Sequence, residues 1–193
     1  VLWVMANGMY DSLQQARDTY YEDQHMAEMA AGVVRAPLAL ATRLAAVPGV
    51  RELEARVAGV GLLDLAGRDE PVSALMVSLP PDRAPRVNRI VMRAGRLPDP
   101  TRPGEVLVNE AFAEANGIAV GTSLGAIIYG KRREVRVVGI ASSPEFVFAV
   151  APGAMLPEPE RFGIVWMDRE SLARAFDRDG AFNEVVMRLD PGA

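Results

Sequence analysis

The sequence predicts an α+β fold, in which βαβ-type units from both ends of the chain form one mixed α/β subdomain around an inserted, smaller β-rich subdomain. Strand and helix patterns alternate in residues 26–79 and again in residues 164–189. The intervening part carries several strand patterns and one short helix, and proline-rich segments border it on both sides. Such borders suit an insertion point, so we expect residues 1–86 and 158–193 to form the discontinuous subdomain and residues 87–157 the insert.

Composition limits the class of protein. With 193 residues, of which 50% are hydrophobic, the chain is long enough to bury a substantial core. The formal net charge of -4 argues against a nucleic-acid surface, which would need lysine and arginine clustered on one face. The chain has no cysteine, which excludes disulfides, thiolate metal sites and cysteine nucleophiles.

The beginning of the chain combines an apolar start with a helical pattern. Residues 5–24 carry an apolar stripe at helical spacing, which predicts a helix. Residues 1–6 are apolar but too few to cross a bilayer, which requires about twenty residues. Composition alone leaves two interpretations open, namely an ordinary amphipathic start and the outer end of a transmembrane helix.

Residues 26–34 carry conflicting signals. The spacing of Met26, Met29 and Val33 favours a helix, whereas Gly32 and the Val33-Val34 pair favour a strand. The local pattern therefore leaves the conformation of this segment open.

The remainder of the first part predicts a helix and two strands. Pro37 suits the first turn of a helix that ends at Pro48-Gly49. Alternating apolar residues then predict one long, half-buried strand over residues 53–65. Residues 75–79 are expected to be its hairpin partner.

The insert begins with a strand and a capped helix. The apolar run at residues 106–108 is too short for a helix and predicts a buried strand. Asn109 is expected to cap the helix that follows, and Gly117 is expected to end it in a left-handed conformation.

A hairpin completes the insert, and a βαβ unit follows. Residues 124–129 and 134–140 predict two strands joined by a turn at residues 130–133. In the last part, residues 164–189, strands flank a helix that Asp168 is expected to cap.

Several motifs resemble functional sites, but each lacks a defining residue. Residues 125–131 match most of a phosphate-binding P-loop, yet Arg132 stands where the Mg²⁺ ligand Ser or Thr is required. Residues 59–61 lack the third glycine of a dinucleotide fingerprint, and the acidic turn at residues 177–180 lacks later calcium ligands. His25 is the only imidazole, so it has no second histidine for catalysis or metal binding. We therefore predict no catalytic residue, no cofactor and no metal ligand.

The segment 146–156 is the strongest candidate for a binding surface. It places Phe146, Phe148, Met155 and Leu156 among prolines and small residues. Two interpretations stay open: a lid packed against the core, and an exposed patch for a partner or an apolar ligand. These four residues are our candidate partner or cargo surface.

Six segments, taken in order along the chain, carry a family resemblance. They are the apolar start that leads into a helix, and the motifs LAAVPGV (44–50), GRLP (95–98), EVLVNE (105–110), GIAVGT (117–122) and VRVVGI (135–140). Together they are similar to the extracytoplasmic domain, or periplasmic core, of ABC-transporter permeases of the FtsX/MacB/LolC type. The resemblance implies the discontinuous fold, a strand at residues 26–34, and a first helix that extends a truncated transmembrane helix ending in residues 1–8.

The resemblance also implies a function. In this family ATP is hydrolysed by a separate subunit, so the domain is expected to be non-enzymatic. It is expected to face the periplasm or the extracellular side of the bacterial inner (plasma) membrane, to bind cargo or a partner protein, and to transmit motion driven by ATP hydrolysis. The implied partners are a cytoplasmic ABC ATPase subunit, a second permease copy, and a periplasmic adaptor, a lipoprotein or a peptide cargo.

Two alternatives from other classes stay open. A secreted hydrolase with a carboxylate-based site predicts a deep pocket in which two carboxyl groups with raised pKa converge. An extracytoplasmic ligand-sensing domain predicts a closed apolar cavity lined by residues 146–156.

Overall fold

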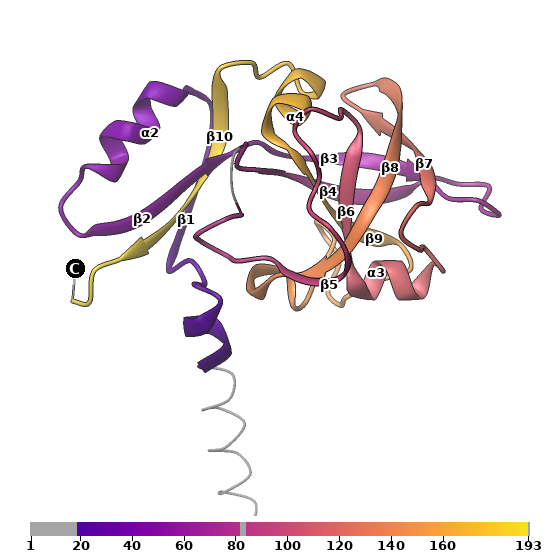
Figure 1. Ribbon diagram of the computed structural model, residues 1–193, viewed down its shortest axis with the longest axis horizontal. Coiled ribbons are helices and arrows are strands. Elements are labelled where there is room, and N and C mark those ends of the chain that lie inside the picture. The colour runs from indigo at the N-terminus through magenta and orange to yellow at the C-terminus, as the bar shows by residue number, and fades with distance from the viewer. Residues whose placement is uncertain (1–18, 82–83, 193) are drawn as a thin grey trace, which may run out of the picture.

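The computed structural model describes residues 19–81 and 84–192 of the chain, which form two sheets lying side by side along the long axis of the molecule (Figure 1). The smaller sheet has three antiparallel strands in the order β1-β10-β2. One helix, α2, packs against it. The bounds of these elements are Met29–Pro37 for β1, Leu38–Ala45 for α2, Val50–Arg56 for β2 and Ala181–Leu189 for β10.

The larger sheet has seven strands in the order β5-β8-β6-β9-β4-β3-β7. Strand β8 also pairs with β7, so six of these strands form a closed barrel and β5 lies outside it. Closure leaves no unpaired edge among the barrel strands. The bounds are Ala58–Asp64 for β3, Val72–Leu79 for β4, Val91–Gly95 for β5, Glu105–Asn109 for β6, Ser123–Ile128 for β7, Lys131–Ser142 for β8 and Phe162–Asp168 for β9.

Apolar side chains on the two faces of the barrel strands build separate cores. The inner cluster includes Leu63, Met76, Val108 and Val165, and the helices α3 (Glu110–Ala115) and α4 (Arg169–Ala175) add to it. An outer cluster on β4, β6, β8 and β9 is covered by residues from the connections around it. Strands β6 and β9 are therefore buried along their whole length.

The helix ends follow the predicted signals in α2 and α4. Helix α2 begins directly after Pro37 and ends before Pro48-Gly49. The Asp168 carboxylate accepts a hydrogen bond from the backbone N–H of Ser171 at 3.0 Å, which satisfies a free donor in the first turn of α4. The Asp168 cap is confirmed, whereas Pro37 is the N-cap of α2 and the last residue of β1, one position before the predicted first turn.

Helix α3 begins where predicted, but the predicted side-chain cap is wrong. Asn109 makes no capping hydrogen bond; its Oδ1 accepts from the backbone N–H of Ile164 at 2.7 Å. The amide ties the end of β6 to β9, because a buried backbone donor there requires a partner. Gly117 follows the helix with a φ of 61°, as predicted for a left-handed stop.

The long strand predicted over residues 53–65 is two strands in different sheets. Strand β2 ends at Arg56, and β3 begins at Ala58 in the barrel. Between them, buried Val57 donates its N–H to the Ser78 hydroxyl at 2.9 Å. The Asn183 side chain bonds both the N–H and the carbonyl of Ala58, at 2.9 and 2.8 Å. Alternation continues through the break, so the pattern alone could not locate it.

The two sheets do not divide where the predicted subdomain boundaries fall. Strands β3 and β4, from the predicted segment 1–86, and β9, from 158–193, belong to the same barrel as β6, β7 and β8 from 87–157. Parallel pairing of β4 with β9 and antiparallel pairing of β9 with β6 join all three pieces. The smaller sheet, in which β10 lies between β1 and β2, is the sheet that contains no strand from residues 87–157.

The segment with conflicting signals is a strand. Strand β1 begins at Met29 and extends to Pro37, somewhat later than the predicted 26–34. Residues 19–23 are helical, in agreement with the end of the predicted helix 5–24. The rest of that helix, and the predicted transmembrane end at residues 1–8, lie outside the described residues.

Candidate functional site

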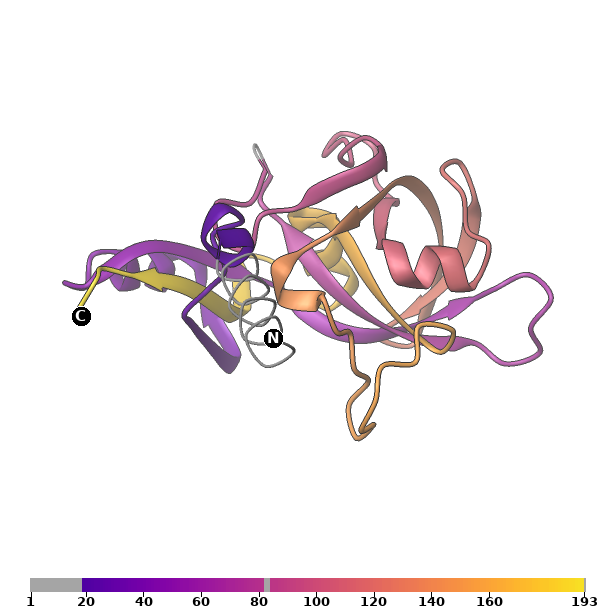
Figure 2. The ribbon, with the colours of Figure 1, turned by 90° about the horizontal axis from the view of Figure 1, so that it is seen from below.

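The connection between β8 and β9 carries the apolar residues singled out in the sequence. It begins with a short helix, η1 (Pro144–Phe146), and then projects from the body of the molecule (Figure 2). Phe146 points inward, with its ring centroid 6.0 Å from that of Trp166. Phe148, Met155 and Leu156 are 75%, 95% and 72% exposed. Of the four candidate residues, Phe146 is thus packed against the barrel and the other three are exposed.

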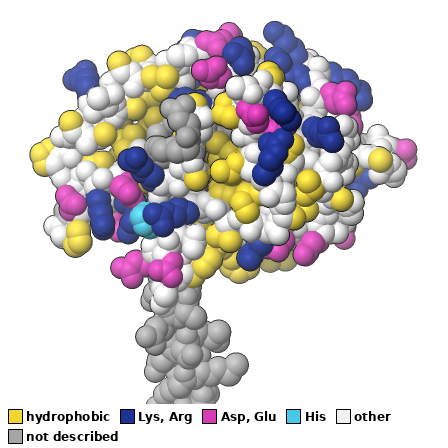
Figure 3. Space-filling model, viewed as in Figure 1, with side chains coloured by type: hydrophobic (Ala, Val, Ile, Leu, Met, Phe, Trp, Pro, Cys, Tyr) yellow, Lys and Arg dark blue, Asp and Glu magenta, His cyan; other side chains and the backbone are white. Residues whose placement is uncertain are grey.

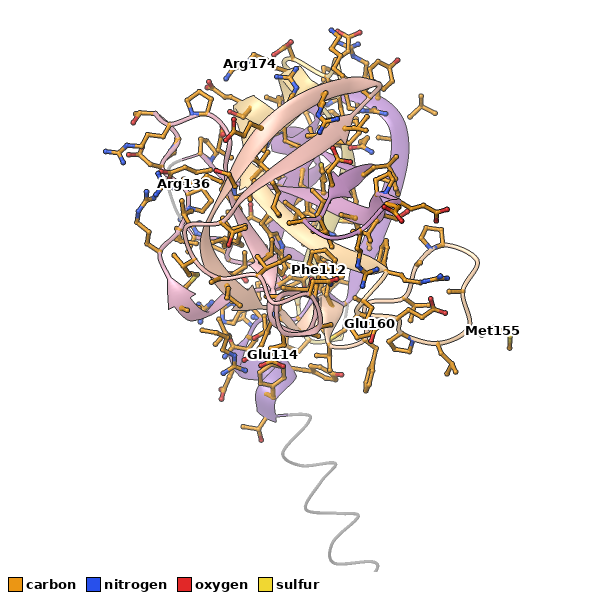
Figure 4. All side chains as sticks on the ribbon, turned by 90° about the vertical axis from the view of Figure 1, so that its right-hand side faces the viewer. Phe112, Glu114, Arg136, Met155, Glu160 and Arg174 are labelled. Carbon is orange, nitrogen blue, oxygen red and sulfur yellow. The ribbon has the colours of Figure 1, made fainter. Side chains whose placement is uncertain are left out.

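Met155 lies at the outer end of this projection, away from the two sheets (Figure 4). No charged residue occurs in the sequence from Phe146 to Pro157. We refer to residues 147–156 as the apolar loop. Its exposed large apolar side chains are those of Val147, Phe148, Val150, Met155 and Leu156, whereas Ala149 and Ala151 pack against the outer cluster.

A groove of about 500 Å³ lies beside the apolar loop. Phe146, Phe148 and Trp166 line it together with Tyr20 and Tyr21 from the first described helix. Because Phe148 is mostly exposed, the groove is open along this edge and is not the closed cavity that a ligand-sensing domain predicts. The two tyrosines and Trp166 were not predicted, because nothing in the local sequence indicates that these distant segments meet.

A charged pair stands at the edge of this groove. The Arg93 Nε lies 3.1 Å from Glu110 Oε2, and both side chains are partly exposed to solvent. The groove therefore combines aromatic walls with one cation and one anion at its rim, a mixture suited to an amphipathic protein segment.

Four polar residues meet where the two sheets join, and we call them the junction cluster: Arg56, Asn88, Glu145 and Glu184. The Arg56 guanidinium donates Nη1–H to Glu145 Oε2 at 2.7 Å and makes a second, shorter contact with Oε1 of the same carboxylate. Its Nε donates to Glu184 Oε2 at 2.6 Å. The Asn88 Nδ2 donates to Glu145 Oε2, also at 2.7 Å. Each member comes from a different part of the chain.

Burial and charge act in opposite directions on Arg56. Burial by itself lowers the pKa of this guanidinium, since a charged group loses its hydration. The hydrogen bonds and charge of Glu145, followed by those of Glu184, outweigh that loss and raise the pKa of Arg56 above its ordinary value. The Arg56 guanidinium therefore stays charged at any physiological pH.

The junction cluster also holds the segment that leads into β1. The Asn88 Oδ1 accepts from the N–H of Ala27 at 2.7 Å, and its backbone N–H donates to the His25 carbonyl at 2.8 Å. His25 Nδ1 lies 3.1 Å from Glu52 Oε2 on β2. His25, the cyan side chain in Figure 3, lies among basic and acidic side chains. The first described residues are thus fixed to both β2 and the connection before β5.

The motifs that resemble a P-loop and a dinucleotide fingerprint have structural roles. Residues 125–131 belong to the hairpin β7–β8, whose turn is Tyr129-Gly130, with φ values of 50° and 74°, and not the predicted 130–133. Gly59 and Gly61 allow Phe176 and Met76 to approach the backbone closely. Within the described part of the chain, no group of three His, Asp or Glu residues is placed to hold a metal ion.

Two carboxyl groups, those of Glu105 and Asp99, have lowered pKa values, whereas the hydrolase alternative requires raised ones. The side-chain hydrogen bond from Arg96 lowers the pKa of Glu105, and hydrogen bonds from Thr101 lower that of Asp99. A carboxylic acid that donates protons at neutral pH needs the opposite shift. These two groups stabilise the connection between β5 and β6.

Solved structures with a similar fold are extracytoplasmic domains of ABC-type transporters. The extracellular domain of the noncanonic ABC-type transporter YknZ from Gram-positive bacteria is 12% identical, with a TM-score of 0.51; the alignment covers 81% of this chain and 74% of that one. The periplasmic region of MacB from Actinobacillus actinomycetemcomitans is 10% identical, with a TM-score of 0.49, and the alignment covers 81% and 66% of the two chains. This chain thus spans slightly less than two thirds of the MacB region.

The likeness to the YknZ domain confirms the predicted resemblance at the level of the fold: this chain has the mixed α/β fold of an ABC permease extracytoplasmic domain. No protein-family model matches the sequence, and no curated protein matches it significantly. Within residues 19–81 and 84–192, no helix is both long and apolar enough to cross a membrane.

Proposed function

We propose that this chain is the extracytoplasmic domain of an ABC-transporter permease, which binds cargo or a partner protein and transmits motion driven by cytoplasmic ATP hydrolysis. The observation that carries the proposal is the exposed apolar loop, with Phe148, Met155 and Leu156 outward, on a fold shared with such a domain. The proposed location is the periplasmic or extracellular side of the bacterial inner (plasma) membrane.

Exposure of the apolar loop supports binding of a partner. Burial of apolar surface contributes roughly 25 cal/mol per Å², so three large apolar side chains that remain in water represent binding free energy available to a partner. Phe146 anchors the same segment inward against Trp166, which limits the entropy lost when the loop is covered. The proposed occupant is a periplasmic adaptor, a lipoprotein or a peptide cargo.

The arrangement of the chain ends supports transmission of motion. Strand β1 follows the first described helix, and β10 ends near the last described residue. These two strands pair along most of their length, from Met29–Met187 to Pro37–Ala181. A displacement applied to either end of the chain therefore acts on the same small sheet, which is the arrangement required for moving the domain as a body. A cytoplasmic ATPase subunit and a second permease copy are the proposed partners in this motion.

The test replaces Phe148, Met155 and Leu156 together with serine in the intact permease, assayed with its ATPase subunit in membrane vesicles. Loss of the apolar contact is expected to lower cargo- or partner-stimulated ATP hydrolysis by about tenfold, which corresponds to about 1.4 kcal/mol. Val60→Ser, which changes an exposed valine on β3, is the matched control and should leave hydrolysis unchanged.

The gene supplies an independent check of the proposal. The full-length product should contain hydrophobic spans beside this domain, and an ATPase should be encoded nearby. A gene product without membrane spans, or a triple variant with full stimulated hydrolysis, would contradict the proposed function.

A further inference from the structure

An ion pair at the base of the apolar loop joins it to the small sheet. The loop connects two barrel strands, β8 and β9, and belongs to the barrel by sequence. Glu145, at its base, nevertheless pairs with Arg56, the last residue of β2 in the small sheet. The Arg56 and Glu145 side chains are only 9% and 22% exposed, so little water competes for this contact.

We infer that Arg56 is a positioning residue, which fixes the base of the apolar loop to the small sheet so that the loop follows the sheet when the chain ends move. This inference rests on the proposed function and adds the connection through which motion reaches the binding surface.

Geometry favours the ion pair as a rigid connection. The planar guanidinium contacts both oxygens of Glu145, and a two-pronged contact of this kind fixes orientation as well as distance. The third donor of Arg56, Nε, is held by Glu184, its direct cross-strand neighbour on β10. Arg56 therefore cannot turn away from Glu145 without breaking a bond within its own sheet.

Further hydrogen bonds also hold the base of the apolar loop in place. Asn88 donates to Glu145 and accepts from Ala27, so the carboxylate is also tied to the segment that enters β1. The Ser143 hydroxyl, just before η1, donates to the Asn88 carbonyl at 3.4 Å. The base of the loop thus contacts β2 directly and, through Asn88, the segment that precedes β1.

The experiment measures the distance between the loop and the small sheet by pulsed electron paramagnetic resonance. Because the chain has no cysteine, Phe148→Cys and Arg51→Cys provide two unique spin-label sites, one on the loop and one on β2. Glu114→Cys, on α3 of the barrel, paired with Arg51→Cys reports whether the sheets themselves have moved.

Glu145→Gln is expected to widen the loop-to-sheet distance distribution about twofold, because removing one charge of a partly buried pair releases the other from its fixed geometry. The barrel-to-sheet distribution should stay unchanged. Glu184→Gln is the matched control. It removes one charge beside the same guanidinium, but the amide oxygen can still accept from Arg56 Nε, so the contact with Glu145 and the loop distance should stay as they are. Equal distributions in the parent and Glu145→Gln, or equal widening in both variants, would overturn the inference.

Hydrogen exchange keeps the inference testable if Glu145→Gln does not fold. Arg56→Lys retains the charge but loses the two-pronged contact, and faster amide exchange confined to residues 146–156 is the expected result. Exchange identical to the parent would overturn the inference. Neither measurement depends on transport, so the two proposals can fail separately. A wider loop-to-sheet distance distribution with unchanged ATP hydrolysis in the Glu145→Gln permease would support the positioning role of Arg56 and contradict only the proposed function.

Discussion

The barrel and the small sheet of this domain differ in closure and in the size of their hydrophobic cores. The barrel is closed and filled by a cluster of buried residues from all six strands and two helices. The small sheet has six buried apolar residues, Ala36, Ala181, Phe182, Val185, Val186 and Met187, and its covering helix α2 buries none of its own residues fully. The difference indicates that the barrel is the stable body, whereas the sheet at the chain ends depends on its connections to that body.

Polar contacts, including those of the junction cluster, join the small sheet to the barrel. The three-stranded sheet and its one helix have a small core, since α2 has no fully buried residue. The bonds of Arg56 to Glu145, of Asn183 to Ala58, and of Arg169 Nη1 to the Ala55 carbonyl at 2.7 Å hold it to the barrel. In the proposed function, motion applied at the chain ends would act on the small sheet, and these polar contacts would carry it to the barrel.

Removing a side chain from the barrel core should have the largest effect. Phe112 on α3 is fully buried and packs against Gly163, whose missing side chain leaves room for the ring. Phe112→Ala is expected to lower the free energy of unfolding by about 3–5 kcal/mol. Urea denaturation measures this loss, and Glu114→Ala on the exposed face of the same helix should change stability by less than about 0.5 kcal/mol. A small effect of Phe112→Ala would mean that the barrel is not the stable body.

The equivalent change in the small sheet should be local. Phe182 on β10 is buried against the residues of the sheet and α2. Phe182→Ala is expected to cost about 3 kcal/mol at most, because the sheet can open while the barrel stays folded. Hydrogen exchange should become faster in β1, β2 and β10 and remain slow in β6 and β9. Uniform acceleration in both sheets would show that the two regions unfold as one unit.

The smallest expected effect is the acid sensitivity of the β5–β6 connection. Hydrogen bonding to Arg96 lowers the folded-state pKa of Glu105 below its unfolded value, so the stability it adds is present above the unfolded pKa and is lost as pH falls through the folded pKa. Arg96 is half exposed, and solvent screens the pair. The free energy of unfolding of Glu105→Gln should therefore fall slightly less than that of the parent as the pH drops below about 4.5.

Urea unfolding at neutral and acidic pH measures this difference. Glu114→Gln removes one exposed carboxyl group and should keep the pH dependence of the parent. The same dependence in Glu105→Gln as in the parent would rule out a contribution of this pair to acid stability.

Local signals predicted most of the elements correctly. Pro37, Asp168 and Gly117 mark helix boundaries through backbone geometry that involves only neighbouring residues, and the structure follows all three. The hairpins β3–β4 and β7–β8 were also predictable, since their strands are close in sequence. Of the candidate surface, the exposure of Phe148, Met155 and Leu156 agrees with the patch interpretation, whereas Phe146 fits the lid interpretation.

Long-range pairing could not be predicted in the same way. The side chain of Asn109 has the composition of a helix cap, but Ile164, from a strand more than fifty residues away, offers a buried N–H that competes for it. The alternation that predicted one strand over residues 53–65 continues past the break, yet Asn183 and Ser78 fix the crossing between sheets at Val57 and Ala58. Tyr20, Tyr21 and Trp166 share a groove only because the fold brings two remote segments together.

The sequence by itself determined the helices, the hairpins and the apolar character of residues 146–156, because these depend on propensity, turn geometry and composition within a short span. Only the tertiary structure decided that the barrel closes across the predicted insert and that Arg56 reaches Glu145. Both require strands far apart in the chain to meet, and the free energy of that meeting comes from buried surface and paired charges that no local pattern encodes.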